Sequence, residues 1–113
     1  MARTEVTTRH NPEQTRVEAV LASGEVPGFS EYDRPAEGVY RFFHTEVDDE
    51  YAGQGIAKQI AAGVVEFVRG EGARIIPKCS FVRAYMRKHE ETHDLLAPGA
   101  TLEPDPEEQE KSA

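Results

Sequence analysis

The segment VYRFFHTEV at residues 39–47, followed by AGQGIA at residues 52–57, decides the fold of this chain of 113 residues. The first part has the apolar and aromatic content of a β-strand, and the second is a glycine-containing turn that leads into an amphipathic helix. A helix that begins this way presents unpaired backbone N–H groups and the positive end of its dipole. Glycine suits such a turn because a Cβ would keep the backbone away from a bound anion. The sequence therefore predicts a site for a phosphorylated ligand.

The turn differs from the two common nucleotide-binding motifs. A Walker A loop would end in Gly-Lys-Ser or Gly-Lys-Thr, whereas the helix here opens with Ile56, Ala57 and Lys58. A dinucleotide fingerprint would contain a third glycine, which this turn lacks. ATP and NAD are therefore not the first ligands to expect.

The composition excludes several classes of protein. With 13 basic and 21 acidic residues, the net charge of −8 argues against nucleic-acid binding and favours cationic partners. No apolar run approaches the ~18 residues of a membrane span, and no signal-peptide pattern is present. One cysteine cannot form an internal disulfide, which favours a reducing compartment. We expect a cytoplasmic protein that binds no membrane and is a monomer or a weak dimer.

Three shorter strands are expected before residue 39, at residues 6–9, 15–21 and 26–32. Pro27 and Gly28 interrupt the third, which indicates an edge strand or a bulge, and residues 34–38 form a loop. The strand at 39–47 has apolar side chains at both alternating sets of positions, so we expect it to be central and covered on both faces.

A helix is expected from about residue 55 to residue 71, then a strand at 74–77 and a second helix from 80 to about 91. The first helix has an apolar stripe at a spacing of four, widened by Phe67. The stripe consists of Ile56, Ile60, Val64 and Val68. This order predicts an α+β fold, with an antiparallel meander joined to one β-α-β crossover and helices packed on the sheet. Residues 97–113 are rich in proline and acid, so we predict a domain at 1–96 and a disordered acidic tail at 97–113.

Four short motifs in this order resemble a known family. They are His44-Thr45-Glu46-Val47, Gly53-x-Gly55-Ile56-Ala57, Pro77-x-Cys79-Ser80-Phe81-Val82 and Tyr85. Together they resemble the short, single-domain branch of the GNAT N-acetyltransferase superfamily, over about residues 6–96. The resemblance implies a minimal GNAT-like fold, whose twisted, mostly antiparallel sheet splays open between its fourth and fifth strands. It also implies that the chain binds acetyl-coenzyme A (acetyl-CoA).

By this resemblance, the strand at residues 43–47 hydrogen-bonds the pantetheine arm through its backbone, and the turn at 52–57 holds the pyrophosphate. Ala52 stands where the superfamily usually has glutamine or arginine, but binding through backbone amides does not need that side chain. Lys58 and Lys78 are candidate phosphate contacts, or else solvated surface lysines. The residues implied to bind the coenzyme are Thr45, Glu46, Val47, Ala52, Gly53, Gln54, Gly55, Ile56, Ala57 and Lys58.

Cys79 is the first candidate for a catalytic role. It precedes a predicted helix, and a helix N-terminus makes a thiolate more available. The resemblance places it beside the acetyl thioester, as a nucleophile or as a residue that contacts the acyl group. The alternative is a small buried hydrophobic residue without a chemical role.

Tyr85 and His44 are the other catalytic candidates. The resemblance suggests that Tyr85 protonates the coenzyme A thiolate, with core packing as the alternative. His44 and Glu46 lie two residues apart on one strand face, so together they are candidates to deprotonate an amine through water. The alternative for His44 is a buried core histidine, which we slightly favour from the sequence.

His89-Glu90-Glu91-Thr92-His93 matches the H-E-x-x-H pattern of zinc hydrolases. Its context argues against that chemistry. Glu91 is charged where such helices are usually apolar, Arg87 and Lys88 precede the match, and no histidine follows it as a third ligand. We therefore expect no metal.

The sequence predicts an acetyl-CoA-dependent N-acetyltransferase whose acceptor is an amine. By the resemblance, an amine attacks the thioester carbonyl while a backbone N–H near Val47 stabilises the oxyanion. The acidic net charge favours cationic acceptors, such as a protein lysine or a polyamine. The alternative from another class is a non-catalytic module that binds an acyl-CoA and acts as a sensor or interaction partner.

Overall fold

The computed structural model describes residues 4–103. Five strands and two α-helices make up the fold, with two short 3-10 helices. In chain order the elements are β1 (Thr7–Asn11), β2 (Arg16–Val20), β3 (Gly28–Ala36), β4 (Val39–Val47), η1 (Asp49–Tyr51), α1 (Ile56–Gly70), β5 (Arg74–Pro77), α2 (Ser80–Lys88) and η2 (Glu90–Leu95). Within residues 4–103, no helix is both long and apolar enough to cross a bilayer.

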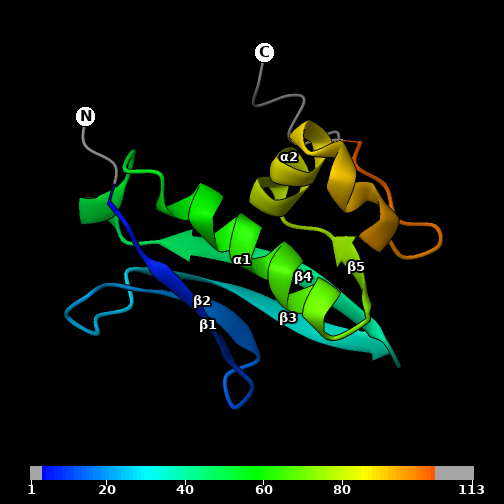
Figure 1. Ribbon diagram of the computed structural model, residues 1–113, viewed down its shortest axis with the longest axis horizontal. Helices are drawn as coiled ribbons and strands as arrows, with labels where there is room; N and C mark the ends of the chain where they lie inside the picture. The colour runs from blue at the N-terminus through cyan, green and yellow to red at the C-terminus, as the bar shows by residue number, and fades with distance from the viewer. Residues whose placement is uncertain (1–3, 104–113) are drawn as a thin grey trace.

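The strands form one sheet in the order β1-β2-β3-β4-β5, and each of the first three pairs of neighbours is antiparallel. β5 pairs with β4 in parallel, after α1 has crossed over one face of the sheet (Figure 1). α2 packs against α1 and β5. This arrangement confirms the predicted α+β fold with one β-α-β crossover.

The apolar stripe of α1 forms the centre of the core. All four predicted members of the stripe are at most 1% exposed, and Phe67 packs against them at the margin. They face the buried side chains of the sheet and of α2. The largest of these side chains are Tyr32, Tyr40, Phe42, Ile75, Val82 and Met86. The helical spacing was therefore a correct guide to the buried face of α1.

The third strand was predicted too short, and of the two alternatives that Pro27 and Gly28 indicated, an edge strand or a bulge, the edge strand is wrong. β3 lies between β2 and β4 and runs on to Ala36, so most of the predicted loop at 34–38 belongs to it. Pro27 lies just before the strand, where its missing N–H interrupts no ladder. The register with β4 is regular from Gly28 to Glu31 and shifts between Glu31 and Tyr32 and again between Asp33 and Ala36, so the irregularities lie away from Pro27 and Gly28.

β4 has the predicted bounds and two neighbouring strands, but it is not covered on both faces, and Phe43 is 47% exposed. Glu31 pairs with His44 and Tyr32 with Phe42, so Phe43 is an extra residue on β4. Such a bulge shifts the alternation of side chains. Apolar residues at both odd and even positions of a strand therefore do not require two buried faces. A strand with one buried face and a bulge gives the same pattern.

The second helix ends three residues earlier than predicted. α2 stops at Lys88, and His89 leaves the helical conformation with φ −125° and ψ 86°. Two histidine rings then hydrogen-bond backbone carbonyls in the last turn of α2. His89 Nδ1 donates to Tyr85 O at 2.7 Å, and His93 Nε2 donates to Met86 O at 2.8 Å. Side-chain bonds of this kind end a helix, which the residue count alone does not indicate.

The segment that follows η2 packs against the domain. Ala97 N donates to Ile75 O at 2.9 Å, and the Arg87 guanidinium donates to Leu102 O at 2.8 and 3.0 Å. Residues 97–103 of the predicted tail therefore make ordered contacts. The remainder, residues 104–113, lies outside the described residues, and the division into domain and tail stays a prediction.

Gly28 allows β3, β4 and α1 to approach one another. A Cβ at Gly28 would lie 2.6 Å from Glu46 O and 3.1 Å from Ile60 Cδ1. We expect Gly28→Ala to lower the free energy of unfolding by about 1–3 kcal/mol, because a backbone oxygen cannot move aside without shifting the strand. Gly70→Ala is the control, since a Cβ there meets nothing within 4 Å, and helical alanine is neutral or stabilising. Urea unfolding of both variants measures the difference, and equal midpoints would contradict this role of Gly28.

Candidate active site

β4 and β5 separate halfway along β4. Their pairing runs only from Val39 with Arg74 to Phe42 with Pro77. Beyond this point Lys78 N and Cys79 N both donate to Phe42 O, at 2.9 and 3.0 Å, and the chain turns into α2. Within the described residues, no strand pairs with residues 43–47 on this side. An unpaired strand of this kind can hydrogen-bond an extended ligand through its backbone.

Cys79 lies at the base of this fork. It is the N-cap residue of α2 and is 6% exposed, and its Sγ donates to Thr45 Oγ1 at 2.9 Å. Thr45 Oγ1 donates in turn to Ser30 Oγ at 3.0 Å. The thiol therefore connects the two arms of the fork, which fits both a packing role and a position beside a bound acyl group.

A pocket of about 240 Å³, here called the fork pocket, opens beside Cys79. Residues of β4, of the segment after β5 and of the start of α2 line this pocket. Its lining residues are Phe43, His44, Thr45, Lys78, Cys79, Ser80, Phe81 and Arg83. Two of the three predicted catalytic residues, His44 and Cys79, are thus brought together, along with the predicted coenzyme contact Thr45.

His44 is half exposed and is not the core histidine that the sequence slightly favoured. Its Nε2 lies 3.2 Å from Glu46 Oε1, and its ring meets Phe29 edge-on at 6.3 Å between centroids. Both side chains point to the sheet face opposite α1, because the bulge at Phe43 displaces the alternation. A histidine bonded to a carboxylate on an open face can pass a proton to and from water.

The predicted anion site at the start of α1 has the backbone that such a site needs. Gly55 is the N-cap residue of α1 with φ 80°, and Gly53 has φ 77°. Among residues 4–103, no side chain caps this helix end, and its first turn contains no acidic residue but does contain Lys58. The turn is anchored because Thr4 N donates to Gln54 O at 3.1 Å. An uncapped N-terminus of a 15-residue helix fits a pyrophosphate.

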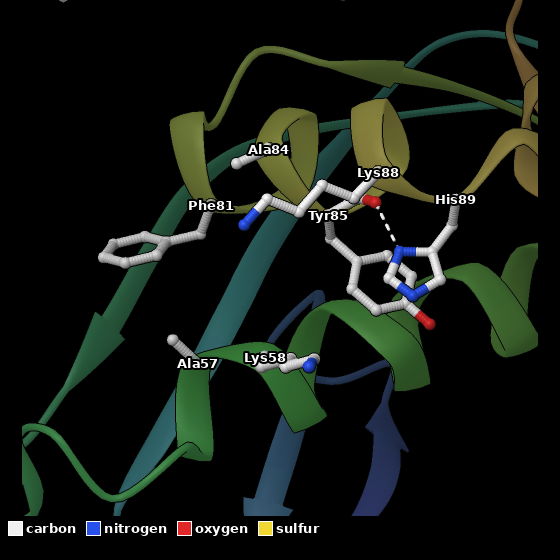
Figure 2. Close-up of a pocket in the computed structure, with 7 residues that line it drawn as sticks. All are labelled: Ala57, Lys58, Phe81, Ala84, Tyr85, Lys88 and His89. Carbon is white, nitrogen blue, oxygen red and sulfur yellow. Dashed lines mark hydrogen bonds between the residues drawn. The ribbon is translucent and has the colours of Figure 1, made fainter.

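A second pocket, of about 310 Å³, lies between α1 and α2 and is here called the interhelical pocket (Figure 2). Lys58 projects from α1 and Lys88 from α2. Figure 2 shows the rings of Tyr85 and His89 stacked, with centroids 4.0 Å apart. The lining is completed by Ala57, Phe81 and Ala84. Phe81 also lines the fork pocket, so the two pockets are neighbours.

The structure does not bring Tyr85 to the other catalytic candidates, because Tyr85 lines the interhelical pocket and not the fork pocket. Burial raises the pKa of the Tyr85 hydroxyl above its ordinary value, and the negative charges of Glu91 and Glu66 raise it further. The hydroxyl is therefore neutral near pH 7 and can donate a proton but cannot act as a base.

The H-E-x-x-H match is not built as a zinc site. The motif of zinc hydrolases needs both histidines one turn apart on one α-helix, whereas His89 follows the end of α2 and His93 lies in the 3-10 helix η2. Among residues 4–103, no group of three or more histidine, cysteine, aspartate or glutamate side chains is arranged to hold a metal ion.

Of the face of α2 that lines this pocket, the sequence pointed to Tyr85 alone. Five residues on this helix and just after it line the interhelical pocket, and their spacing is that of one helix face. They are Phe81, Ala84, Tyr85, Lys88 and His89. The signal was present in the sequence, since positions three, four, seven and eight apart lie together on a helix.

Glu91 lies close enough to Tyr85 for a test of its ionisation. We expect the Tyr85 hydroxyl to titrate above the ordinary tyrosine value of 10.0. The variant Glu91→Gln should lower that pKa by removing a nearby negative charge, whereas Glu37→Gln, in the turn between β3 and β4, should leave it unchanged. NMR titration of the tyrosine Cζ carbons measures both effects. A Tyr85 pKa at or below its ordinary value would contradict this description of the pocket.

A family model described as GCN5-related N-acetyl-transferase matches residues 16–95. Protein NATD1 from Homo sapiens and from Gallus gallus is 31% identical to this chain over 58 residues, which make up 51% of this chain. The matched region covers 51% of the human relative and 53% of the chicken relative, so the chain spans about half the length of these curated relatives.

The fold is also found in a solved structure. The NMR structure of a GCN5-like protein from Staphylococcus aureus superposes with a TM-score of 0.59 and 24% identity, over 86% of this chain and 91% of that one. This likeness shows the fold, and the match of the family model covers both arms of the fork, the turn before α1 and α2. The chain belongs to the GCN5-related N-acetyltransferase family.

Proposed function

We propose that this protein is an acetyl-CoA-dependent N-acetyltransferase that moves an acetyl group to an amine. The observation that carries the proposal is that the fork between β4 and β5 adjoins the uncapped start of α1. The fork pocket and the interhelical pocket share Phe81, and the interhelical pocket includes Ala57 and Lys58 from the first turn of α1. One extended ligand can therefore reach from the fork to an anion site.

The described residues fit acetyl-CoA in three places. The unpaired backbone at residues 43–47 would hydrogen-bond the pantetheine arm, and the turn at 52–57 would hold the pyrophosphate through its N–H groups. Lys58 and Lys88, on the two walls of the interhelical pocket, would add positive charge for the phosphates. At position 52 only the backbone would contact the pyrophosphate, so the alanine that replaces the usual glutamine or arginine of the superfamily does not prevent binding.

Acetyl-CoA supplies an activated acetyl group: the amine nitrogen bonds to the acetyl carbon, the carbon–sulfur bond breaks, and the sulfur leaves as a thiol with the proton that the amine gave up. His44, hydrogen-bonded to Glu46, would accept the amine proton through water. A backbone N–H near Val47 would stabilise the oxyanion. Cys79 lies at the base of the fork, as an acyl acceptor or as a residue that contacts the acyl group. Tyr85 is protonated near pH 7 but lines the interhelical pocket and not the fork pocket, so the proton of the departing sulfur would come from the amine, through His44 and water.

The first test is a titration of the protein with acetyl-CoA and with coenzyme A, followed through backbone amide shifts. We expect shifts at Val47 and at residues 54–58. Gly55→Ala should weaken binding by about tenfold or more, because a Cβ obstructs the anion and strains a left-handed residue. Gly38→Ala is the matched control: its φ of 75° gives a similar strain, but it lies in the turn between β3 and β4.

Absence of any shift at millimolar ligand would contradict the proposal. Tight binding of coenzyme A with no acetyl transfer to any of a panel of amines would support the alternative, a non-catalytic acyl-CoA-binding module.

The role of Cys79 can be separated from that of a direct transfer. Incubation with acetyl-CoA followed by intact-mass measurement should show one added acetyl group if the thiol accepts the acyl group. Cys79→Ala should then abolish both this adduct and turnover. If Cys79 only contacts the acyl group, no adduct forms and the variant retains most of its turnover. Ser80→Ala is the control, because Ser80 lines the same pocket and lacks a thiol.

A further inference from the structure

The fork pocket has a local charge opposite to that of the whole chain. Its charged lining residues are Lys78 and Arg83, and His44 lines it as well. Within the described residues, no aspartate or glutamate lines it, although the chain carries 21 acidic and 13 basic residues. Glu46 bonds His44 but lies outside the lining. The pocket is therefore basic on an acidic protein.

Local charge outweighs net charge for a ligand in contact with the pocket. Exposed charges more than a Debye length away, about 8–10 Å at moderate salt, are largely screened. Arg83 is only 2% exposed, and a charge held away from solvent acts more strongly at short range than a surface charge does. The net charge of −8 therefore acts on distant encounters, whereas the charges that line the fork pocket act on a ligand in contact with it.

The same pocket carries exposed aromatic surface. Phe43 and Phe81, at 47% and 51%, are the exposed large hydrophobic side chains of the described residues, and both line the fork pocket. One comes from the bulge of β4 and the other from the first turn of α2, so they are distant in sequence. Exposed aromatic rings gathered beside polar groups mark a binding site more often than isolated apolar residues do.

The pocket is small. Its volume of about 240 Å³ lies below the roughly 300–1,000 Å³ of sites for drug-sized ligands. Two basic side chains, two aromatic side chains and His44 line this space, so its ligand should combine an anion, an apolar group and an amine.

We infer that the acceptor is a free α-amino acid with an aromatic or large aliphatic side chain. Its carboxylate would lie against Lys78 and Arg83, its side chain between Phe43 and Phe81, and its amino group toward His44. The inference rests on the proposed function and names its acceptor class. The amino nitrogen bonds to the acetyl carbon, its proton passes to His44 and then to the departing sulfur, and the products are an N-acetyl amino acid and coenzyme A.

The test compares L-phenylalanine with phenethylamine, which has the same ring and amine but no carboxylate. Initial rates are measured at saturating acetyl-CoA and expressed per neutral amine. We expect kcat/KM to be at least about tenfold higher for L-phenylalanine than for phenethylamine. A factor of this size is expected from one charge-assisted hydrogen bond to the carboxylate. Equal values, a preference for phenethylamine, or faster acetylation of a lysine side chain in a peptide would overturn the inference and leave the proposed function standing.

Two variants connect the preference to the pocket. Lys78→Gln should reduce the ratio of the two kcat/KM values to a few-fold, because it removes the more accessible basic group. Arg41→Gln removes the same charge from β4 but lies outside the pocket, in an ion pair with Asp33, and should leave the ratio unchanged. Equal loss of the ratio in both variants would show a long-range charge effect and would overturn the assignment to the pocket.

Product binding gives a readout without turnover. N-acetyl-L-phenylalanine should shift the amides of Phe43, Lys78 and Phe81, and N-acetylphenethylamine should bind at least about tenfold more weakly. If no amine is acetylated but this difference persists and is lost in Lys78→Gln, the proposed function fails while the pocket's ligand class stands. Equal binding of both compounds overturns the ligand class even if acetyl transfer occurs.

Discussion

The carbonyl of Phe42 is the point on which the rest of the site depends. It accepts hydrogen bonds from Lys78 N and Cys79 N, so one acceptor ends the β4–β5 ladder and begins the turn into α2. Pro77 is the last residue of β5, and the pairing with β4 ends where it lies opposite Phe42. Because the two strands separate here, residues 43–47 keep a free strand edge and Cys79 reaches Thr45 at the base of the fork.

The bulge at Phe43 is the second constraint, and it divides β4 into two parts with different tasks. Before it, Tyr40 and Phe42 belong to the buried core; after it, His44 and Glu46 lie on the open face. A regular strand would have kept one alternation throughout and turned these side chains the other way. The same irregularity exposes Phe43 beside the fork. Bulges next to functional sites are common because they redirect a side chain without changing the sheet.

Much of the fold followed from periodicity, whereas the errors followed from non-local pairing. The spacing of Ile56, Ile60, Val64 and Val68 is a local property of a helix, and it identified the buried face correctly. β3 lies inside the sheet because β2 and β4 pair with it on either side. The residues of β3 alone do not indicate which strands will pair with it. The end of α2 depends on the side chains of His89 and His93 bonding to carbonyls. Similarly, Cys79 and His44 are 35 positions apart in the chain, and only the fork makes them line one pocket.

The sequence by itself determined the class of fold, the β-α-β crossover and the glycine turn before α1, because apolar period and glycine placement are encoded locally. It also identified the family, through short motifs that each lie within a few consecutive residues. Only the tertiary structure decided that the pocket beside Cys79 is basic and aromatic on an acidic chain. Lys78, Arg83, Phe43 and Phe81 meet there because two strands part and a bulge redirects one of them. Net charge is a sum over the chain, whereas a binding site is made by the few residues that the fold brings together.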